Sequence, residues 1–75
     1  MGTVGTDLNL LRELRRSRNK TQWDVGQALG YKSKSSYAMM ELGQYEIDVK
    51  TANGIAEYLN FSDREVLAVF FPSYA

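Results

Sequence analysis

The chain has 75 residues, with nine Lys and Arg against nine Asp and Glu, and 44% of its residues are apolar. A chain of this size buries only about 60% of its unfolded surface, so we expect one small domain over residues 1–75, with its core at about 7–71. The absence of Cys excludes disulfides and thiolate zinc sites, and the absence of His removes the commonest general base and metal ligand. No apolar run approaches the ~20 residues of a membrane span, and no segment predicts a secretory signal. We therefore expect a cytoplasmic, non-enzymatic domain with no cofactor, no membrane contact and no small-molecule substrate.

The zero net charge hides an uneven distribution. Residues 1–40 carry seven basic and three acidic side chains, a net charge of +4, whereas residues 41–75 carry two basic and six acidic side chains, a net charge of −4. Such asymmetry indicates a basic face that meets a polyanion. Because the halves of a sequence need not be faces of a fold, charge alone leaves nucleic-acid binding and an ordinary charged surface as equal alternatives.

Residues typical of helix ends recur along the chain. Side chains that can cap helix N-termini occur at Asp7, Thr21, Ser33, Asp48 and Ser62. Residues that tolerate the left-handed conformation closing a helix occur at Asn19, Gly30, Gly43 and Asn60. Together they predict an all-α fold of five short helices, at residues 7–18, 21–29, 34–42, 48–59 and 62–70.

The apolar spacing within these ranges is helical. The predicted core consists of Leu8, Leu11, Leu14, Val25, Ala28, Leu29, Tyr37, Met40, Val49, Ala52, Ile55, Ala56, Leu59, Val66, Leu67 and Phe70. Gly26 interrupts the second helix, where Gly is about 1 kcal/mol less favourable than Ala. We expect it to permit the close approach of a crossing helix.

The second and third predicted helices are joined by a short turn at Gly30, as in helix-turn-helix repressors. Residues 11–15 (LRELR) and 21–30 (TQWDVGQALG) resemble the first two helices of the Xre/Cro-type, lambda-repressor-like DNA-binding family. Residues 33–43 resemble the recognition helix of that family with its closing Glu-x-Gly, and residues 49–60 resemble its fourth helix. The resemblance implies a compact five-helix DNA-binding domain of a bacterial or phage regulator.

A recognition helix of this kind lays its N-terminal half in the DNA major groove. Tyr37 and Met40 fix the core side of the third helix, so the opposite face predicts four base-reading residues, which are Lys34, Ser35, Ala38 and Met39. Lys34 can donate to guanine acceptors, and Ser35 can pair with either kind of base edge. The other two side chains can press on a thymine methyl group.

Phosphate contacts are expected around the same groove. Gln22 and Trp23 lie near the start of the second helix, where free amides and the helix dipole attract anions. Further candidates are Lys32, Ser33, Ser36, Gln44 and Tyr45. Trp23 has two alternatives that stay open: its indole N–H donates to the DNA backbone, or its ring packs back onto Leu8 or Lys20.

The resemblance also implies a structural ion pair between Arg15 and Glu41, which joins the first helix to the third. The apolar tail leaves two alternatives open. Either Phe70 closes the core, or Phe70 and Phe71 form a contact for a homodimer, since repressors of this class bind pseudo-palindromes as dimers.

The expected function is therefore a sequence-specific DNA-binding transcriptional regulator of the repressor type, whose partner is a double-stranded DNA operator. The alternative is a protein-interaction module, such as an antitoxin or antirepressor, which the zero net charge and the acidic Glu46 favour. An enzyme is discounted, because no His, no Cys and no paired carboxylates are available for acid–base or nucleophilic chemistry.

Overall fold

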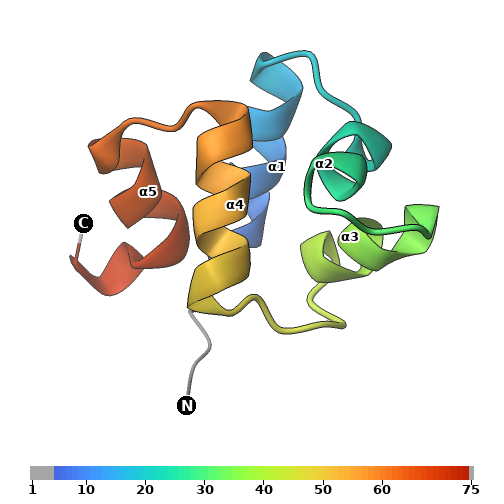
Figure 1. Ribbon diagram of the computed structural model, residues 1–75. Helices are drawn as coiled ribbons and strands as arrows, with labels where there is room; N and C mark the ends of the chain where they lie inside the picture. The colour runs from blue at the N-terminus through green and yellow to red at the C-terminus, as the bar shows by residue number, and fades with distance from the viewer. Residues whose placement is uncertain (1–4, 75) are drawn as a thin grey trace.

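The computed structural model describes residues 5–74, which form five α-helices and one short 3-10 helix (Figure 1). They are α1 (Leu8–Ser17), α2 (Gln22–Ala28), α3 (Lys34–Glu41), α4 (Val49–Leu59), α5 (Asp63–Phe70) and η1 (Pro72–Tyr74). In Figure 1, α4 stands at the centre with α1 behind it, α2 and α3 on one side and α5 on the other. The all-α prediction is confirmed, and each helix ends within one residue of its predicted bounds.

Each helix begins at the capping residue that the sequence predicts. A side-chain oxygen accepts a hydrogen bond from the first turn in every case, at Asp7, Thr21, Ser33, Asp48 and Ser62. Two of these caps are reciprocal capping boxes, formed by Thr21 with Asp24 and by Ser62 with Glu65. The four residues expected to close helices all have positive φ, between 58° and 88°. Local chemistry therefore determines the helix boundaries.

Apolar residues from all five helices and from the loop after α3 form the core. It consists of Leu11, Val25, Tyr37, Met40, Ile47, Ala52, Ile55, Ala56, Leu59, Val69 and Phe70. Three predicted core positions are wrong, because Val49 is 59% exposed, Leu67 is 43% exposed and Ala28 is exposed. In α5 the face turned to the protein contains Val69, so Leu67 points to solvent, and Val49 is only the first residue of its helix.

Polar contacts from α1 and its flanking residues attach α5 to the rest of the fold. The Asp7 N–H donates to the Val69 carbonyl oxygen at 2.7 Å. Arg18, which caps the C-terminus of α1, donates through Nε to the Leu59 carbonyl oxygen at 2.8 Å and through Nη2 to Glu65 Oε1 at 2.7 Å. One guanidinium thus joins the ends of α1 and α4 to the start of α5.

The crossing helix expected at Gly26 is α3, but the crossing does not require glycine. A β-carbon added at Gly26 would lie 3.5 Å from Tyr37 Cβ, which is an ordinary van der Waals distance. The tighter helical glycine is Gly54 in α4, where an added β-carbon would lie 2.8 Å from Leu29 Cδ2. The α2–α3 crossing therefore has room for alanine.

We expect Gly26→Ala to raise the free energy of unfolding by up to about 1 kcal/mol, because alanine has the higher helix propensity. Gly30→Ala is the matched control, since φ at Gly30 is +88°, and we expect it to lower the free energy of unfolding by about 1 kcal/mol. Urea denaturation measures both. A less stable Gly26→Ala protein would contradict the observed space at the crossing.

Candidate nucleic-acid interface

α2 and α3 form a helix-turn-helix whose turn is held by main-chain and capping hydrogen bonds. Gly30 reverses the chain with φ +88°, and the Tyr31 N–H donates back to the Gly26 carbonyl oxygen at 3.0 Å. Ser33 Oγ then accepts from the Ser35 N–H at 3.3 Å and starts α3. The turn therefore fixes the angle at which α3 is presented to solvent.

The four predicted base-reading residues lie on the solvent-facing side of α3. Lys34 and Ser35 are exposed, while Ala38 and Met39, one turn further on, are half-buried. The opposite side of the helix is buried through Tyr37, Met40 and Glu41. The Ser35 hydroxyl also lies 2.9 Å from Ser33 Oγ, so the cap orients it. The structure thus brings together the short and flexible side chains that the sequence analysis places on one face.

The candidate phosphate-binding residues around α3 differ in solvent exposure and in whether their side chains already make hydrogen bonds. Lys32, Gln44 and Tyr45 are exposed in the loops on either side of the helix. Ser33 is occupied as the α3 cap, and Ser36 is half-buried. Lys32 is the only positively charged residue among these five candidates, and its side chain is exposed to solvent.

The side chains of Gln22 and Trp23, at the start of α2, both contact other parts of the protein. Gln22 Nε2 donates to Glu41 Oε1 at 3.0 Å, so one of its two amide hydrogens is used within the protein. Trp23 is half-buried, and its Cε3 lies 3.7 Å from the position of a β-carbon on Gly26. Its ring thus packs along its own helix, while the Lys20 ammonium lies 5.4 Å from the centroid of the Tyr58 ring.

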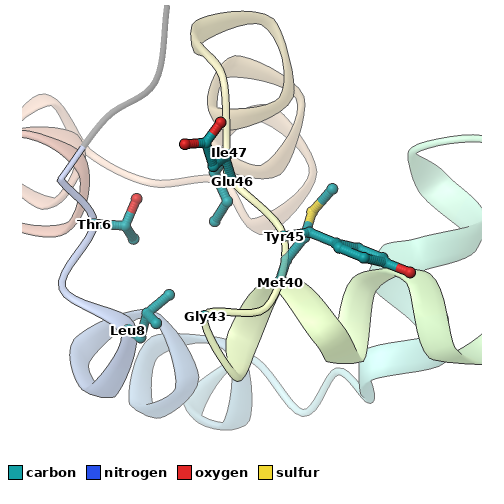
Figure 2. A pocket seen from close by; sticks show the side chains of 7 residues that line it. All are labelled: Thr6, Leu8, Met40, Gly43, Tyr45, Glu46 and Ile47. Atoms are coloured by element: carbon teal, nitrogen blue, oxygen red, sulfur yellow. The ribbon is translucent and has the colours of Figure 1, made fainter. Parts of the chain in front are cut away.

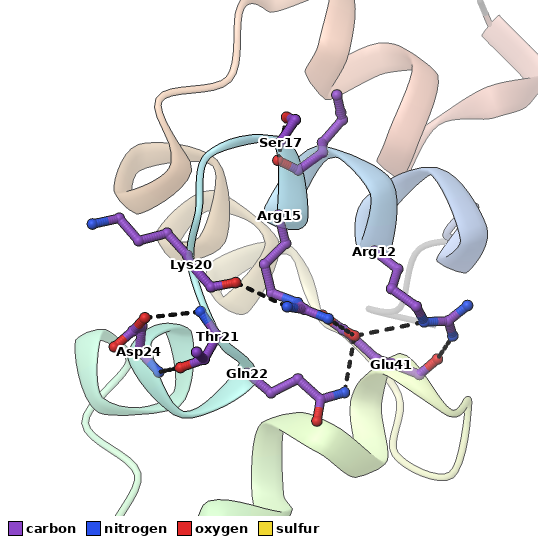
Figure 3. Close-up of polar contacts among 9 residues, drawn as sticks. Arg12, Arg15, Ser17, Lys20, Thr21, Gln22, Asp24 and Glu41 are labelled. Atoms are coloured by element: carbon purple, nitrogen blue, oxygen red, sulfur yellow. Dashed lines mark hydrogen bonds and ion pairs between the residues drawn. The ribbon is translucent and has the colours of Figure 1, made fainter.

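Glu41, the last residue of α3, is the centre of the polar network in Figure 3. Its side chain is fully buried, with 0% exposure, and Arg15 from α1 is 6% exposed. Arg15 donates twice, from Nε to Oε2 at 2.6 Å and from Nη2 to Oε1 at 3.1 Å. Arg15 Nη1 also donates to the Lys20 carbonyl oxygen at 2.9 Å. The predicted ion pair between Arg15 and Glu41 is therefore present and bidentate, and it joins α1 to α3.

The environment of Glu41 favours its ionised form. Burial by itself raises the pKa of the carboxyl group, but the hydrogen bonds from Arg15 and Gln22 outweigh burial and hold the pKa below its ordinary value. Burial, followed by the nearby Glu41 charge, raises the pKa of the Tyr37 hydroxyl above its ordinary value. That hydroxyl is buried beside the Glu41 carboxylate. The network therefore contains one stable carboxylate and a neutral phenol.

Arg12 is a member of this network that the sequence analysis missed. Its Nη2 donates to the Glu41 main-chain carbonyl oxygen at 2.7 Å, and its Nε lies 3.7 Å from Glu41 Oε1. The sequence spacing could have indicated this role, because Arg12 and Arg15 are three residues apart and therefore share one face of α1.

Ion pairs between basic side chains of residues 1–40 and acidic side chains of residues 41–75 neutralise much of the charge difference between the two halves. Arg12 and Arg15 pair with Glu41, and Arg18 pairs with Glu65. The exposed basic residues with no ion pair among residues 5–74 are Arg16, Lys32, Lys34, Lys50 and Arg64. The positive charge left beside the turn and α3 is therefore small.

Among the hollows on the surface of residues 5–74, two involve the loop after α3 or the helix α5. One, of about 200 Å³, separates the start of α1 from the loop after α3 (Figure 2); it is lined by Thr6, Leu8, Met40, Gly43, Tyr45, Glu46 and Ile47. The other, the α4–α5 groove, has about 190 Å³ and is lined by Val49, Lys50, Ala52, Asn53, Ala56, Val66, Phe70 and Phe71. Among residues 5–74, no three acidic side chains are grouped to hold a metal ion.

In the C-terminal tail, the burial of Phe70 supports the first of the two alternatives left open by the sequence. Phe70 is 1% exposed, so it closes the core. Its ring lies 6.2 Å from that of Phe61, measured between centroids. Phe71 remains half-buried, and the following 3-10 helix places the Tyr74 ring edge-on against it at 6.4 Å.

Residues 11–66 match the model of the helix-turn-helix family. The chain therefore belongs to that family, in its Xre and lambda-repressor-like form, and to the class of DNA-binding regulators. No curated protein and no solved structure gives a significant match. Among the described residues, no helix has the length and apolar character to cross a membrane.

We expect Arg15→Ala and Glu41→Ala each to lower the free energy of unfolding by about 3–5 kcal/mol. Glu41→Ala leaves Arg15 as an unpaired buried cation, and Arg15→Ala leaves the buried Glu41 carboxylate with the longer contact to Arg12 as its only ion pair. Small domains have only about 5–15 kcal/mol of stability, so either variant would be close to unfolding at room temperature. Arg16→Ala is the control, as an exposed arginine on the same helix, and should change stability by less than about 0.5 kcal/mol. Urea denaturation measures all three, and unchanged midpoints for Arg15→Ala and Glu41→Ala would contradict the structural role.

Proposed function

We propose that this chain is a sequence-specific transcriptional regulator of the repressor type, which reads a DNA operator by placing α3 in the major groove. The observation that carries the proposal is the solvent-facing side of α3, held at a fixed angle by the turn and by the buried Glu41 network. The proposal requires no catalysis and no cofactor, and it places the protein in the cytoplasm, where the DNA is.

The side chains of this face suit the base edges of the major groove. The Lys34 ammonium, exposed at the first residue of α3, can donate to the O6 and N7 atoms of guanine. The Ser35 hydroxyl can donate or accept. Ala38 and Met39 are apolar and match a thymine methyl group. Because Ser35 and Ala38 are small, the main chain of α3 can approach the groove floor closely.

Phosphate contacts are proposed for donors at both ends of this surface. Lys32 precedes the α3 cap, and Gln44 and Tyr45 follow the helix, so they lie where the two strands of the DNA backbone would pass. At the start of α2, Gln22 has one amide hydrogen on Glu41, and its second hydrogen and the Trp23 indole N–H are the proposed donors. Ser33 and Ser36 complete the proposed set.

A protein-interaction module is the second candidate function. The observation that favours it is the internal use of Arg12, Arg15 and Arg18, which leaves few cations for DNA on a chain of zero net charge. The two candidates differ in one property: a repressor discriminates between DNA sequences, whereas an antitoxin or antirepressor that binds protein does not.

We expect Lys34→Ala and Met39→Ala to weaken binding to a duplex selected from a random-sequence library by about 1–3 kcal/mol, with little effect on a scrambled duplex. Lys32→Ala should weaken binding to both duplexes and reduce the slope of log K against log salt by about one. Binding curves at several salt concentrations measure these effects.

Gln22→Ala is not a clean probe of a phosphate contact, because it also removes a hydrogen bond from Glu41. Arg64→Ala, an exposed arginine on α5, is the charge control. Equal losses on both duplexes for Lys34→Ala and Met39→Ala would show that α3 does not read the sequence. The absence of any DNA binding at low salt would favour the protein-interaction module.

We also propose that the protein binds its operator as a homodimer through the α4–α5 groove. The groove is largely apolar, and the exposed Val49 and half-buried Phe71 lie on its rim. Two copies would then read half-sites spaced about 34 Å apart, one turn of DNA.

Phe71→Ser should lower the apparent mass in sedimentation equilibrium and weaken binding to a duplex with two half-sites, because it makes the groove polar. Leu42→Ser, at an exposed leucine after α3, is the control and should leave the mass unchanged. A wild-type protein that remains monomeric at high concentration would remove this proposal.

A further inference from the structure

The C-terminus of α3 is completed by a side chain from another helix. The last four carbonyl groups of any α-helix have no partner within the helix. In α3, three of them accept from amides that follow: Ala38 from Leu42 at 3.1 Å, Met39 from Gln44 at 2.9 Å, and Met40 from Gly43 at 3.1 Å. The fourth, the Glu41 carbonyl, accepts from Arg12 Nη2 of α1 at 2.7 Å.

The Arg12 guanidinium is itself oriented. Its Nη1 donates to Asn9 Oδ1 at 3.1 Å, one turn earlier on α1, and its Nε faces Glu41 Oε1 at 3.7 Å. The side chain is 27% exposed, so it is shielded on the protein side and open on the other. The positive charge of Arg12 also lies at the negative, C-terminal end of the α3 dipole, where it is stabilising.

The bond from Arg12 restrains the main chain of α3, whereas the bonds from Arg15 restrain a carboxylate at the end of a flexible side chain. Glu41 is the last residue of α3, so its carbonyl oxygen marks the end of the helix axis. With the turn holding the other end, the position of this oxygen relative to α1 determines the direction of the axis. Base contacts depend on that direction, whereas contacts to a uniformly charged DNA backbone tolerate small changes in it.

We propose that Arg12 is a positioning residue, which sets the base-pair selectivity of α3 by fixing its C-terminal carbonyl and not by contacting DNA. This inference rests on the proposed function of α3 as the reading helix. It assigns to Asn9 the role of orienting Arg12. Mutations of residues that contact no ligand can change the energetic coupling between two sites by about two- to thirtyfold. We expect a change of the same size in the selectivity of α3.

The test measures the ratio of affinities for a library-selected duplex and its scrambled version, at several salt concentrations. Arg12→Met keeps an apolar stem and removes every donor, and we expect it to reduce the ratio about two- to thirtyfold with the wild-type salt slope. Asn9→Ala loses no charge and should reduce the ratio less. Arg64→Met, which removes the same charge from α5, should keep the wild-type ratio.

A wild-type protein that binds both duplexes equally would overturn the proposed function itself. If the wild type is selective and Arg12→Met keeps its ratio, only the positioning role is overturned. Equal weakening on both duplexes with a salt slope smaller by about one would make Arg12 a phosphate contact and overturn the proposal. Should Arg12→Met fail to fold, Asn9→Ala decides: a reduced ratio supports the role, and the wild-type ratio contradicts it.

Discussion

The buried carboxylate of Glu41 is the constraint on which the arrangement of the first three helices depends. A fully buried charge is tolerated only when it is paired and hydrogen-bonded, and here Arg15 and Gln22 supply three hydrogen bonds. These donors come from α1 and from the start of α2, so the hydrogen bonds to Glu41 link the positions of the three helices. The helix-turn-helix is therefore held by its turn at one end of α3 and by electrostatics at the other.

Arginines from α1 and its C-cap perform the same task at two helix ends. Arg12 donates to the terminal carbonyl of α3, and Arg18 donates to the terminal carbonyl of α4. Both also face a glutamate of the acidic half of the chain, which is Glu41 for Arg12 and Glu65 for Arg18. The opposite charges of the two halves thus stabilise the fold. Only a few cations remain for DNA, so selectivity in the proposed function depends on the shape and chemistry of the α3 face more than on net charge.

Local sequence was sufficient for the helix boundaries, because caps such as Asp7 and left-handed residues such as Asn60 act within a few positions. The bidentate pair was anticipated only through the resemblance, since 26 residues separate its members. The buried side of α5 was predicted only in part. Phe70 is buried and Val66 packs against the core as expected. Spacing alone also fits Leu67, but contact with α1 buries Val69 instead. The contacts of Gln22 and Arg12 with Glu41 were also missed, because the relative position of helices is not encoded in any one segment.

The claim that α3 is the part of the molecule that meets DNA is tested most directly by an NMR titration of the isotopically labelled protein with its selected duplex. We expect changes in amide chemical shift at Lys34, Ser35, Ala38 and Met39, at the start of α2 and in the loop after α3, with α5 unaffected outside the α4–α5 groove. Changes confined to the α4–α5 groove, or none at all at low salt, would contradict it.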